Sequence, residues 1–162
     1  MQRNKKVTIG IADTMFARVD MARFAVDTIR KRSKNAKIER YTVPGIKDLP
    51  VACKKLIEEY GCDIVLALGW VGRMPGDEVC ASEASTGLIN VQIVTNTHIL
   101  QVFVHSNESG TEEELYNIAK DRTIKHTLNA LELLKGKTAL TKFAGKGKRQ
   151  GHGDAGPLRS AK

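Results

Sequence analysis

The sequence of 162 residues has few aromatic residues, no long apolar run and no close pair of cysteines. Its apolar stretches are far shorter than a membrane span, and no basic-then-apolar leader precedes them, so we expect no membrane segment. Cys53, Cys62 and Cys80 are an odd number without metal-ligand spacing, which argues against a disulfide framework and fits a reducing cytoplasm. The length suggests one domain with a substantial core.

Several sequence signatures of enzymes are also missing. No Gly-x-Ser-x-Gly elbow is present, and no Gly-x-Gly-x-x-Gly follows the first predicted strand, which removes the usual marks of serine hydrolases and dinucleotide enzymes. No two of the four histidines show metal-ligand spacing, so no metal ligands are predicted. Any chemistry must come from single residues that the fold brings together.

The net charge of +8 is concentrated at the end of the chain. Residues 135–162 carry eight basic side chains and one acidic one, so residues 1–134 are nearly neutral, at +1. A neutral body argues against a nucleic-acid-binding face, although RNA binding by the tail alone is an alternative. We predict an α/β domain over residues 1–134 and a basic, glycine-rich tail over residues 135–162, either disordered or anchored on a neighbouring subunit through Phe143.

Apolar periodicity predicts four strands that alternate with four helices. We expect strands at residues 7–12, 38–43, 63–68 and 99–104, and helices at residues 20–32, 51–60, 77–94 and 111–134. This alternation requires right-handed crossovers and predicts a three-layer α/β fold with a four-stranded parallel sheet, as in flavodoxin-like proteins. Ligands of such folds bind outside the carboxyl ends of the strands.

Aromatic residues gather at the loops predicted for that edge of the sheet. Phe16 follows the first strand, and the sole tryptophan, Trp70, lies in a loop predicted from Gly69 to Gly76. Aromatic side chains on loops beside a carboxylate suit a flat heteroaromatic ring with a polar side chain.

The octapeptide Val43–Pro50 (VPGIKDLP) supplies that carboxylate. Pro44 ends the second strand because it lacks an amide donor, Gly45 allows a positive φ, and Pro50 suits a first helical turn. Asp48 is thereby placed just outside a helix N-terminus, where free amides favour its ionised form. Either Asp48 caps its helix, or it accepts hydrogen bonds from a ligand rich in hydroxyl groups.

Two further titratable residues are candidates for the site. His105 closes the fourth strand and can act as an acid or base near neutral pH, and the alternative is a local hydrogen-bonding role. Glu83 lies one turn into the third predicted helix. It either faces the rim of loops at the carboxyl ends of the strands or is a solvated or subunit-contact residue.

Four longer stretches carry a family resemblance: residues 13–21 (DTMFARVDM), 43–54 (VPGIKDLPVACK), 79–87 (VCASEASTG) and 144–151 (AGKGKRQG). Together they resemble the lumazine synthase superfamily, and within it the archaeal-type riboflavin synthases, over almost the entire chain. The resemblance implies a transferase that dismutates two molecules of 6,7-dimethyl-8-ribityllumazine to riboflavin and 5-amino-6-ribitylaminouracil. It also implies a cytoplasmic homopentamer with sites between subunits, and a magnesium ion for which no protein cage is evident.

The resemblance also implies which residues bind the substrate. Phe16 matches an aromatic side chain that stacks on the ring, and Asp48 matches a glutamate that helps hold the ribityl chain. His105 is our hypothetical proton-transfer residue, and Asp48 is the second catalytic candidate. The tail is expected to close over a neighbour's site. The expected substrate-binding residues are Thr14, Phe16, Arg18, Gly45, Ile46, Lys47, Asp48, Gly69, Trp70, Val71, Glu83, Lys146 and Arg149.

Three departures from lumazine synthases favour riboflavin synthesis. The loop after Gly69 is shorter and holds no histidine, whereas lumazine synthases carry a catalytic histidine there. The Asn-Lys-Gly phosphate element of the last helix is missing, although Arg122 and Lys125 lie near the matching region, and the basic tail is an addition. A substrate without phosphate therefore fits better. The alternatives are a 6,7-dimethyl-8-ribityllumazine synthase and a non-catalytic flavin or lumazine carrier.

Overall fold

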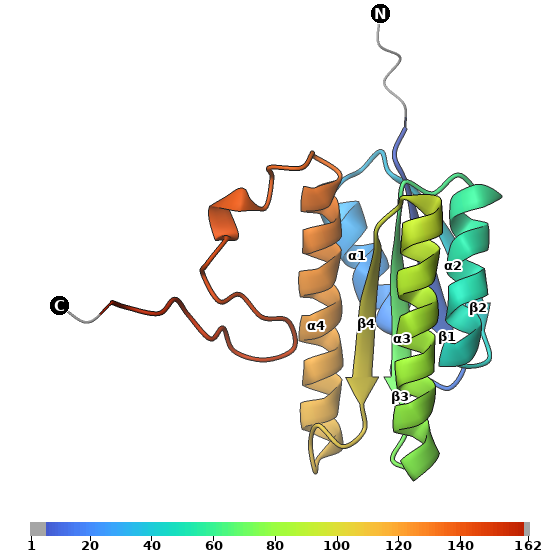
Figure 1. The fold of residues 1–162 in the computed structure, drawn as a ribbon, viewed down its shortest axis with the longest axis vertical. Helices are drawn as coiled ribbons and strands as arrows, with labels where there is room; N and C mark the ends of the chain where they lie inside the picture. Colours follow the sequence, from blue (N-terminus) through green and yellow to red (C-terminus); the bar gives the residue numbers. More distant parts are fainter. Residues whose placement is uncertain (1–5, 161–162) are drawn as a thin grey trace, which may run out of the picture.

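The computed structural model describes residues 6–160 and has a parallel sheet covered by helices on both faces (Figure 1). The sheet order is β2-β1-β3-β4, which confirms the predicted three-layer α/β fold. The strands are β1 (Thr8–Thr14), β2 (Lys37–Val43), β3 (Ile64–Val71) and β4 (Ile99–His105); the helices are α1 (Met21–Arg32), α2 (Leu49–Glu58), α3 (Pro75–Thr95) and α4 (Glu112–Leu133), with short 3-10 helices η1 (Ile46–Asp48) and η2 (Thr141–Phe143).

Two apolar clusters, one on each face of the sheet, hold the layers together. Helices α2 and α3 pack on one face, and α1 and α4 pack on the other. Every side chain of β1 and β3 is buried, because helices cover both faces of these central strands. The edge strand β2 has mostly exposed or half-buried side chains. The core therefore fixes β1 and β3, whose carboxyl ends carry the candidate site.

Local sequence signals set the ends of the helices. The side chain of Asp20 caps α1, and the hydroxyl of Thr111 accepts a hydrogen bond from the third residue of α4. Gly61 follows α2 with a φ of +67°, and Asn96 ends α3 in the left-handed region. These residues place each helix start or end close to its prediction.

The sheet splits at its carboxyl end between β1 and β3. These strands pair only over Ile9–Ala12 and Ile64–Ala67, whereas β1 pairs with β2 as far as Thr14 and β3 pairs with β4 as far as His105. The strand order reverses here, since β1 connects toward β2 and β3 connects toward β4. Such a switch point is where open α/β sheets bind their ligands.

Strand β3 is longer than predicted, which corrects two expectations. Gly69, Trp70 and Val71 belong to the strand and not to a loop, because pairing with β4 continues to Val71. Trp70 is therefore not displayed on the rim: its side chain is 2% exposed, and its indole N–H donates to the hydroxyl of Ser106 over 2.8 Å. Gly45 is extended, with a φ of −149°, so the turn does not use the positive φ that we expected.

Candidate active site

A pocket of about 250 Å³ lies where β1 and β3 diverge. It is enclosed by the loop after β1, the turn after β2, the end of β3 and the start of α3. The lining residues that were predicted to bind substrate are Phe16, Gly45, Ile46, Lys47, Asp48, Trp70 and Val71. Gly72, Asp77 and Cys80 also line the pocket and were not predicted.

Phe16 presents its aromatic ring at this pocket. The side chain is 55% exposed, so surface remains for stacking against a flat ligand. Gly72 lies beneath it, where an added Cβ would lie 3.4 Å from the ring and 2.3 Å from the carboxylate of Asp77. A glycine at position 72 thus allows the end of β3, the ring and the first turn of α3 to approach one another.

Asp48 stands at the N-cap position of α2 but does not cap the helix. Its side chain makes no capping hydrogen bond, and its backbone lies in the helical region (φ −90°, ψ −12°), where a capping residue is normally extended. The capping interpretation is therefore wrong. Within residues 6–160 no hydrogen bond or ion pair engages the carboxylate, which leaves it available to a ligand.

Ile46 packs the turn onto the sheet, and Gly69 makes room for it. A Cβ on Gly69 would lie 2.7 Å from the ring of Phe103 and 2.8 Å from a methyl group of Ile46. Glycine is therefore required in β3 for close packing, whereas the sequence pattern had indicated a loop. Lys47 pairs with Glu83 over 2.8 Å, so Glu83 lies beside the turn without lining the pocket.

Thr14 and Arg18 flank Phe16 without lining the pocket. The hydroxyl of Thr14 is buried and has no hydrogen-bond partner within residues 6–160, a costly arrangement for a polar group. Arg18 pairs with Glu112 in the first turn of α4. Neither residue therefore presents a free polar group at the pocket: the Thr14 hydroxyl is buried, and Arg18 is occupied.

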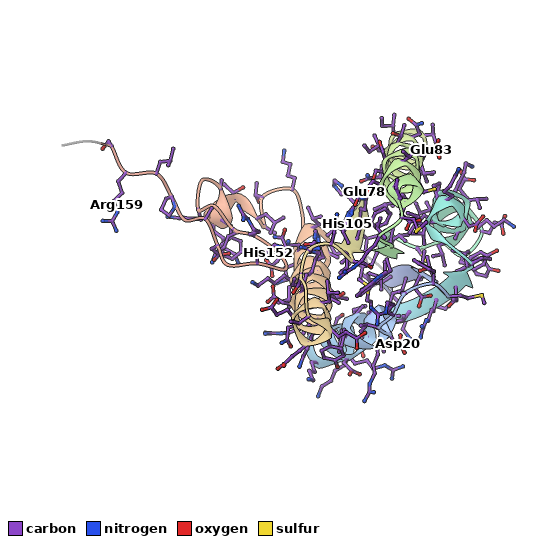
Figure 2. All side chains as sticks on the ribbon, turned by 90° about the horizontal axis from the view of Figure 1, so that it is seen from below. Asp20, Glu78, Glu83, His105, His152 and Arg159 are labelled. Atoms are coloured by element: carbon purple, nitrogen blue, oxygen red, sulfur yellow. The ribbon has the colours of Figure 1, made fainter. Side chains whose placement is uncertain are left out.

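His105 lies at the end of β4 and does not line this pocket. Its Nδ1 is 2.9 Å from a carboxylate oxygen of Glu78, and the side-chain amide of Asn107 lies 3.5 Å from the same oxygen. The side chains of Glu78 on α3 and His105 on β4 lie close together (Figure 2). A single chain therefore does not bring His105 and Asp48 into one cavity. Sequence reasoning missed Glu78, for which the only signal is its place in the first turn of α3.

A partly buried ion pair supports this edge of the sheet. Both carboxylate oxygens of Glu108 accept from the guanidinium of Arg122, over 2.6 and 2.7 Å, and Glu108 also accepts from the backbone amide of His105 over 2.8 Å. Burial, the largest influence, raises the pKa of Glu108, but hydrogen bonds from Arg122, the His105 amide and His152 together outweigh it and lower this pKa to about 2.

The tail folds back onto the same edge. The amide of Gly151 donates to Asp121 over 2.9 Å, and Nε2 of His152 lies 3.1 Å from Glu108. Figure 2 shows His152 beside α4, with the rest of the tail extending outward to Arg159. The tail thus contacts its own chain.

Lys146 and Arg149 lie outside the pocket of their own chain. Arg149 contributes instead to a hollow of about 570 Å³ between the tail and α4, which Phe143 also lines. Its backbone amide donates to Asp154 over 3.0 Å, in a loop closed by an ion pair of Lys148 with Asp154. The structure does not bring the predicted tail residues to Phe16 or Asp48.

Residues 6–160 contain no group of three or more His, Cys, Asp or Glu side chains that could hold a metal ion. No helix in this range is both long and apolar enough to cross a membrane.

Comparison with known proteins gives consistent matches. The family model of 6,7-dimethyl-8-ribityllumazine synthase matches residues 6–137. A riboflavin synthase of Methanothermobacter thermautotrophicus is 55% identical over 152 residues, which cover 94% of this chain and 99% of that protein. A riboflavin synthase of Archaeoglobus fulgidus is 49% identical, covering 93% of this chain and 97% of that protein. A 6,7-dimethyl-8-ribityllumazine synthase of Prochlorococcus marinus is 31% identical, covering 56% of this chain and 59% of that protein.

Proposed function

The chain belongs to the 6,7-dimethyl-8-ribityllumazine synthase family, and from that premise we propose that it is a riboflavin synthase. One lumazine transfers a four-carbon unit to a second, which becomes riboflavin, and the donor leaves as 5-amino-6-ribitylaminouracil. The reaction balances without an oxidant, since the two products contain all atoms of the two substrates. The observation that carries the proposal is the similarity of 94% of the chain to nearly the full length of a protein named riboflavin synthase.

Contacts on α4 favour this reaction over lumazine synthesis, which needs a sugar phosphate. Arg122 and Lys125 lie near the region that matches the phosphate element of lumazine synthases. Arg122 is engaged by Glu108 and by the carbonyl of Phe103, and Lys125 pairs with Asp121 over 3.1 Å. Neither cation is left unpaired for a phosphate group. The residues from Gly69 to Asp77 also contain no histidine.

The pocket suits the ring and side chain of a ribityllumazine. We assign stacking on the ring to Phe16 and the ribityl hydroxyls to Asp48, whose carboxylate is unengaged within residues 6–160. Backbone groups of Gly69–Val71 that β4 does not use are assigned to the edge of the ring, because β3 has no pairing with β1 beyond Ala67. The carbonyl of Val71 is not among them, since it accepts from the amide of Ser106. These roles explain why an aromatic ring, a carboxylate and an open strand edge meet at one pocket.

A second substrate must lie close to the first, because the reaction joins two identical molecules. A pocket of about 250 Å³ is small for one ligand, given that ligand pockets are typically ~300–1,000 Å³. We therefore propose that each site is completed by a neighbouring subunit of a homopentamer. More than half of each of Val79, Ile89, Ile93 and Val94 on α3 is exposed, which supports an oligomeric assembly.

We assign proton transfer to His105. The C7 methyl group of one lumazine loses a proton, and its ring delocalises the resulting carbanion, so a modest general base is sufficient. With Nδ1 donating to Glu78, Nε2 is the nitrogen left to accept that proton. Because His105 and Asp48 do not share a cavity within one chain, His105 is expected to act on the pocket of a neighbour.

Magnesium does not fit a cage built from this chain, since residues 6–160 offer no cluster of three metal-binding side chains. A magnesium ion that keeps most of its waters stays part of the proposal, and no step passes through it. Cytoplasmic location is likewise proposed, supported by the three free cysteines, two of them buried.

The proposal is tested by incubating the purified protein with 6,7-dimethyl-8-ribityllumazine alone. Riboflavin and 5-amino-6-ribitylaminouracil should appear in equal amounts, with two lumazines consumed for each riboflavin. A lumazine synthase would form lumazine only when sugar phosphate and pyrimidine are supplied. A carrier would bind lumazine without turnover. Lumazine formation without riboflavin synthesis, or binding without turnover, would overturn the proposal.

A further inference from the structure

Gly151 is a buried residue of the tail whose position depends on having no side chain. Its φ is +85°, and an added Cβ would lie 2.4 Å from Nε of Arg122. Its amide donates to Asp121, and the preceding carbonyl of Gln150 accepts from Arg122 over 3.4 Å. The tail therefore lies directly on the guanidinium of Arg122, where a side chain would be strained by the positive φ and would displace the guanidinium.

Arg122 connects the tail at Gln150 and Gly151 to the end of β4. Its side chain is 12% exposed and donates to the carbonyl of Phe103 over 2.9 Å, as well as to both oxygens of Glu108. The planar guanidinium uses its donors in fixed directions, so a shift of the tail on one side changes the orientation available on the other.

Glu108 carries the connection to His105. One of its oxygens accepts from Arg122 and from the backbone amide of His105, and the other accepts from Arg122 and faces His152 of the tail. The carboxylate of Glu108 thus contacts His152 of the tail through one oxygen and accepts from the backbone amide of His105 through the other.

We propose that the seating of Gly151 on Arg122 makes the tail a positioning element for His105. This inference rests on the proposed function, because it concerns the residue to which proton transfer is assigned. It differs from a tail that merely covers a neighbour's pocket: the tail acts within its own chain, through Arg122 and Glu108. Gly151 is accordingly a positioning residue and touches no substrate.

The test compares Gly151→Ala with Gly153→Ala in the full-length protein. Gly153 lies two residues further along, has no positive φ, and has nothing within 4 Å of an added Cβ, so it is a matched control. We expect Gly151→Ala to lower kcat by about 10-fold or more with KM within about twofold, because displaced catalytic groups lose rate more than binding. Gly153→Ala should retain the wild-type kcat.

Two readouts do not depend on turnover. The amide proton of His105, bonded to a carboxylate, should change its NMR chemical shift in Gly151→Ala and keep it in Gly153→Ala. Trypsin should also cleave at residues 146–149 faster in Gly151→Ala. A second variant, His152→Ala, removes one contact to Glu108 without a backbone clash and should give a smaller change in the same direction.

Equal kcat and equal His105 amide shifts in the two glycine variants would overturn the positioning role. A rise in KM alone would point to a cover over the substrate and would overturn it too. If the wild-type protein makes no riboflavin from lumazine, the proposed function fails, whereas the amide shift still decides whether the tail positions His105.

Discussion

Two regions of the same rim differ in how their polar groups are used. In the pocket at the β1–β3 split, the carboxylate of Asp48 has no partner within residues 6–160. At the end of β4, the polar side chains are engaged with one another: Glu78 faces His105, and Glu108 is held by Arg122. The first region has a carboxylate left for a ligand, and in the second region the polar side chains are already paired.

The difference indicates a division of tasks. Unpaired groups beside an exposed aromatic ring are suited to recognition, because a ligand can satisfy them. A saturated network is suited to holding one side chain in a fixed orientation. We therefore propose that the pocket selects the substrate and that the β4 edge orients His105, to which proton transfer is assigned. The predictions below alter one region and leave the other intact.

Removing one partner of the partly buried ion pair between Glu108 and Arg122 should have the largest effect on stability. Glu108→Ala leaves the partly buried Arg122 without its carboxylate and is expected to lower the free energy of unfolding by about 2 kcal/mol. Glu83→Ala breaks the exposed pair with Lys47 and should cost less than about 1 kcal/mol. Urea unfolding of both variants measures the contrast. Similar losses would show that the β4 edge is no more tightly held than the surface of the pocket.

Removing the stacking ring should weaken substrate binding without affecting stability. Phe16→Ala is expected to raise the dissociation constant of 6,7-dimethyl-8-ribityllumazine by roughly 10-fold or more, since stacking on an aromatic side chain contributes about 1–3 kcal/mol. Met15→Ala, at the neighbouring exposed position that does not line the pocket, is the control. Fluorescence titration measures both constants. Unchanged affinity in Phe16→Ala would remove the ring from the recognition site.

The pH dependence of stability should arise from Glu108 at the end of β4 and His126 on α4, and not from residues of the pocket. Burial and the charge of Arg122 lower the pKa of His126 to about 4, below its unfolded value near 6.5. As the pH falls between these values, the unfolded state binds the proton first, so stability decreases. The lowered pKa of Glu108, about 2, extends the loss below pH 4.5.

Urea midpoints measured from pH 7 to pH 3 test this dependence. His126→Gln should flatten the decrease between pH 6.5 and pH 4 and leave the steeper loss at lower pH. A wild-type profile that stays flat down to pH 4 would contradict the burial of a neutral His126.

The parts of the fold that follow from apolar periodicity were predictable from the sequence. The alternation of four strands and helices, Phe16 on the rim and the turn around Asp48 all depend on local patterns. Trp70 was misplaced because Gly69 reads as a loop signal, whereas its actual cause is the close approach of Phe103 and Ile46 from distant segments. Glu78 carries no local signal of its partner, since its contact with His105 depends on how α3 crosses to β4. The contact of Gly151 with Arg122 likewise depends on tertiary packing.

The central claim is that the pocket of one chain and the β4 edge of another form one active site. Mixing dissociated Phe16→Ala and His105→Gln chains and reassembling them tests it most directly, with riboflavin formation as the readout. With the substrate kept well below the raised dissociation constant of Phe16→Ala, each variant alone should have about a tenth or less of the wild-type activity. Random reassembly should restore about a quarter of the wild-type sites, those that pair an intact pocket with an intact edge. If the mixture stays as inactive as its components, the two regions do not meet between chains, and the account is contradicted.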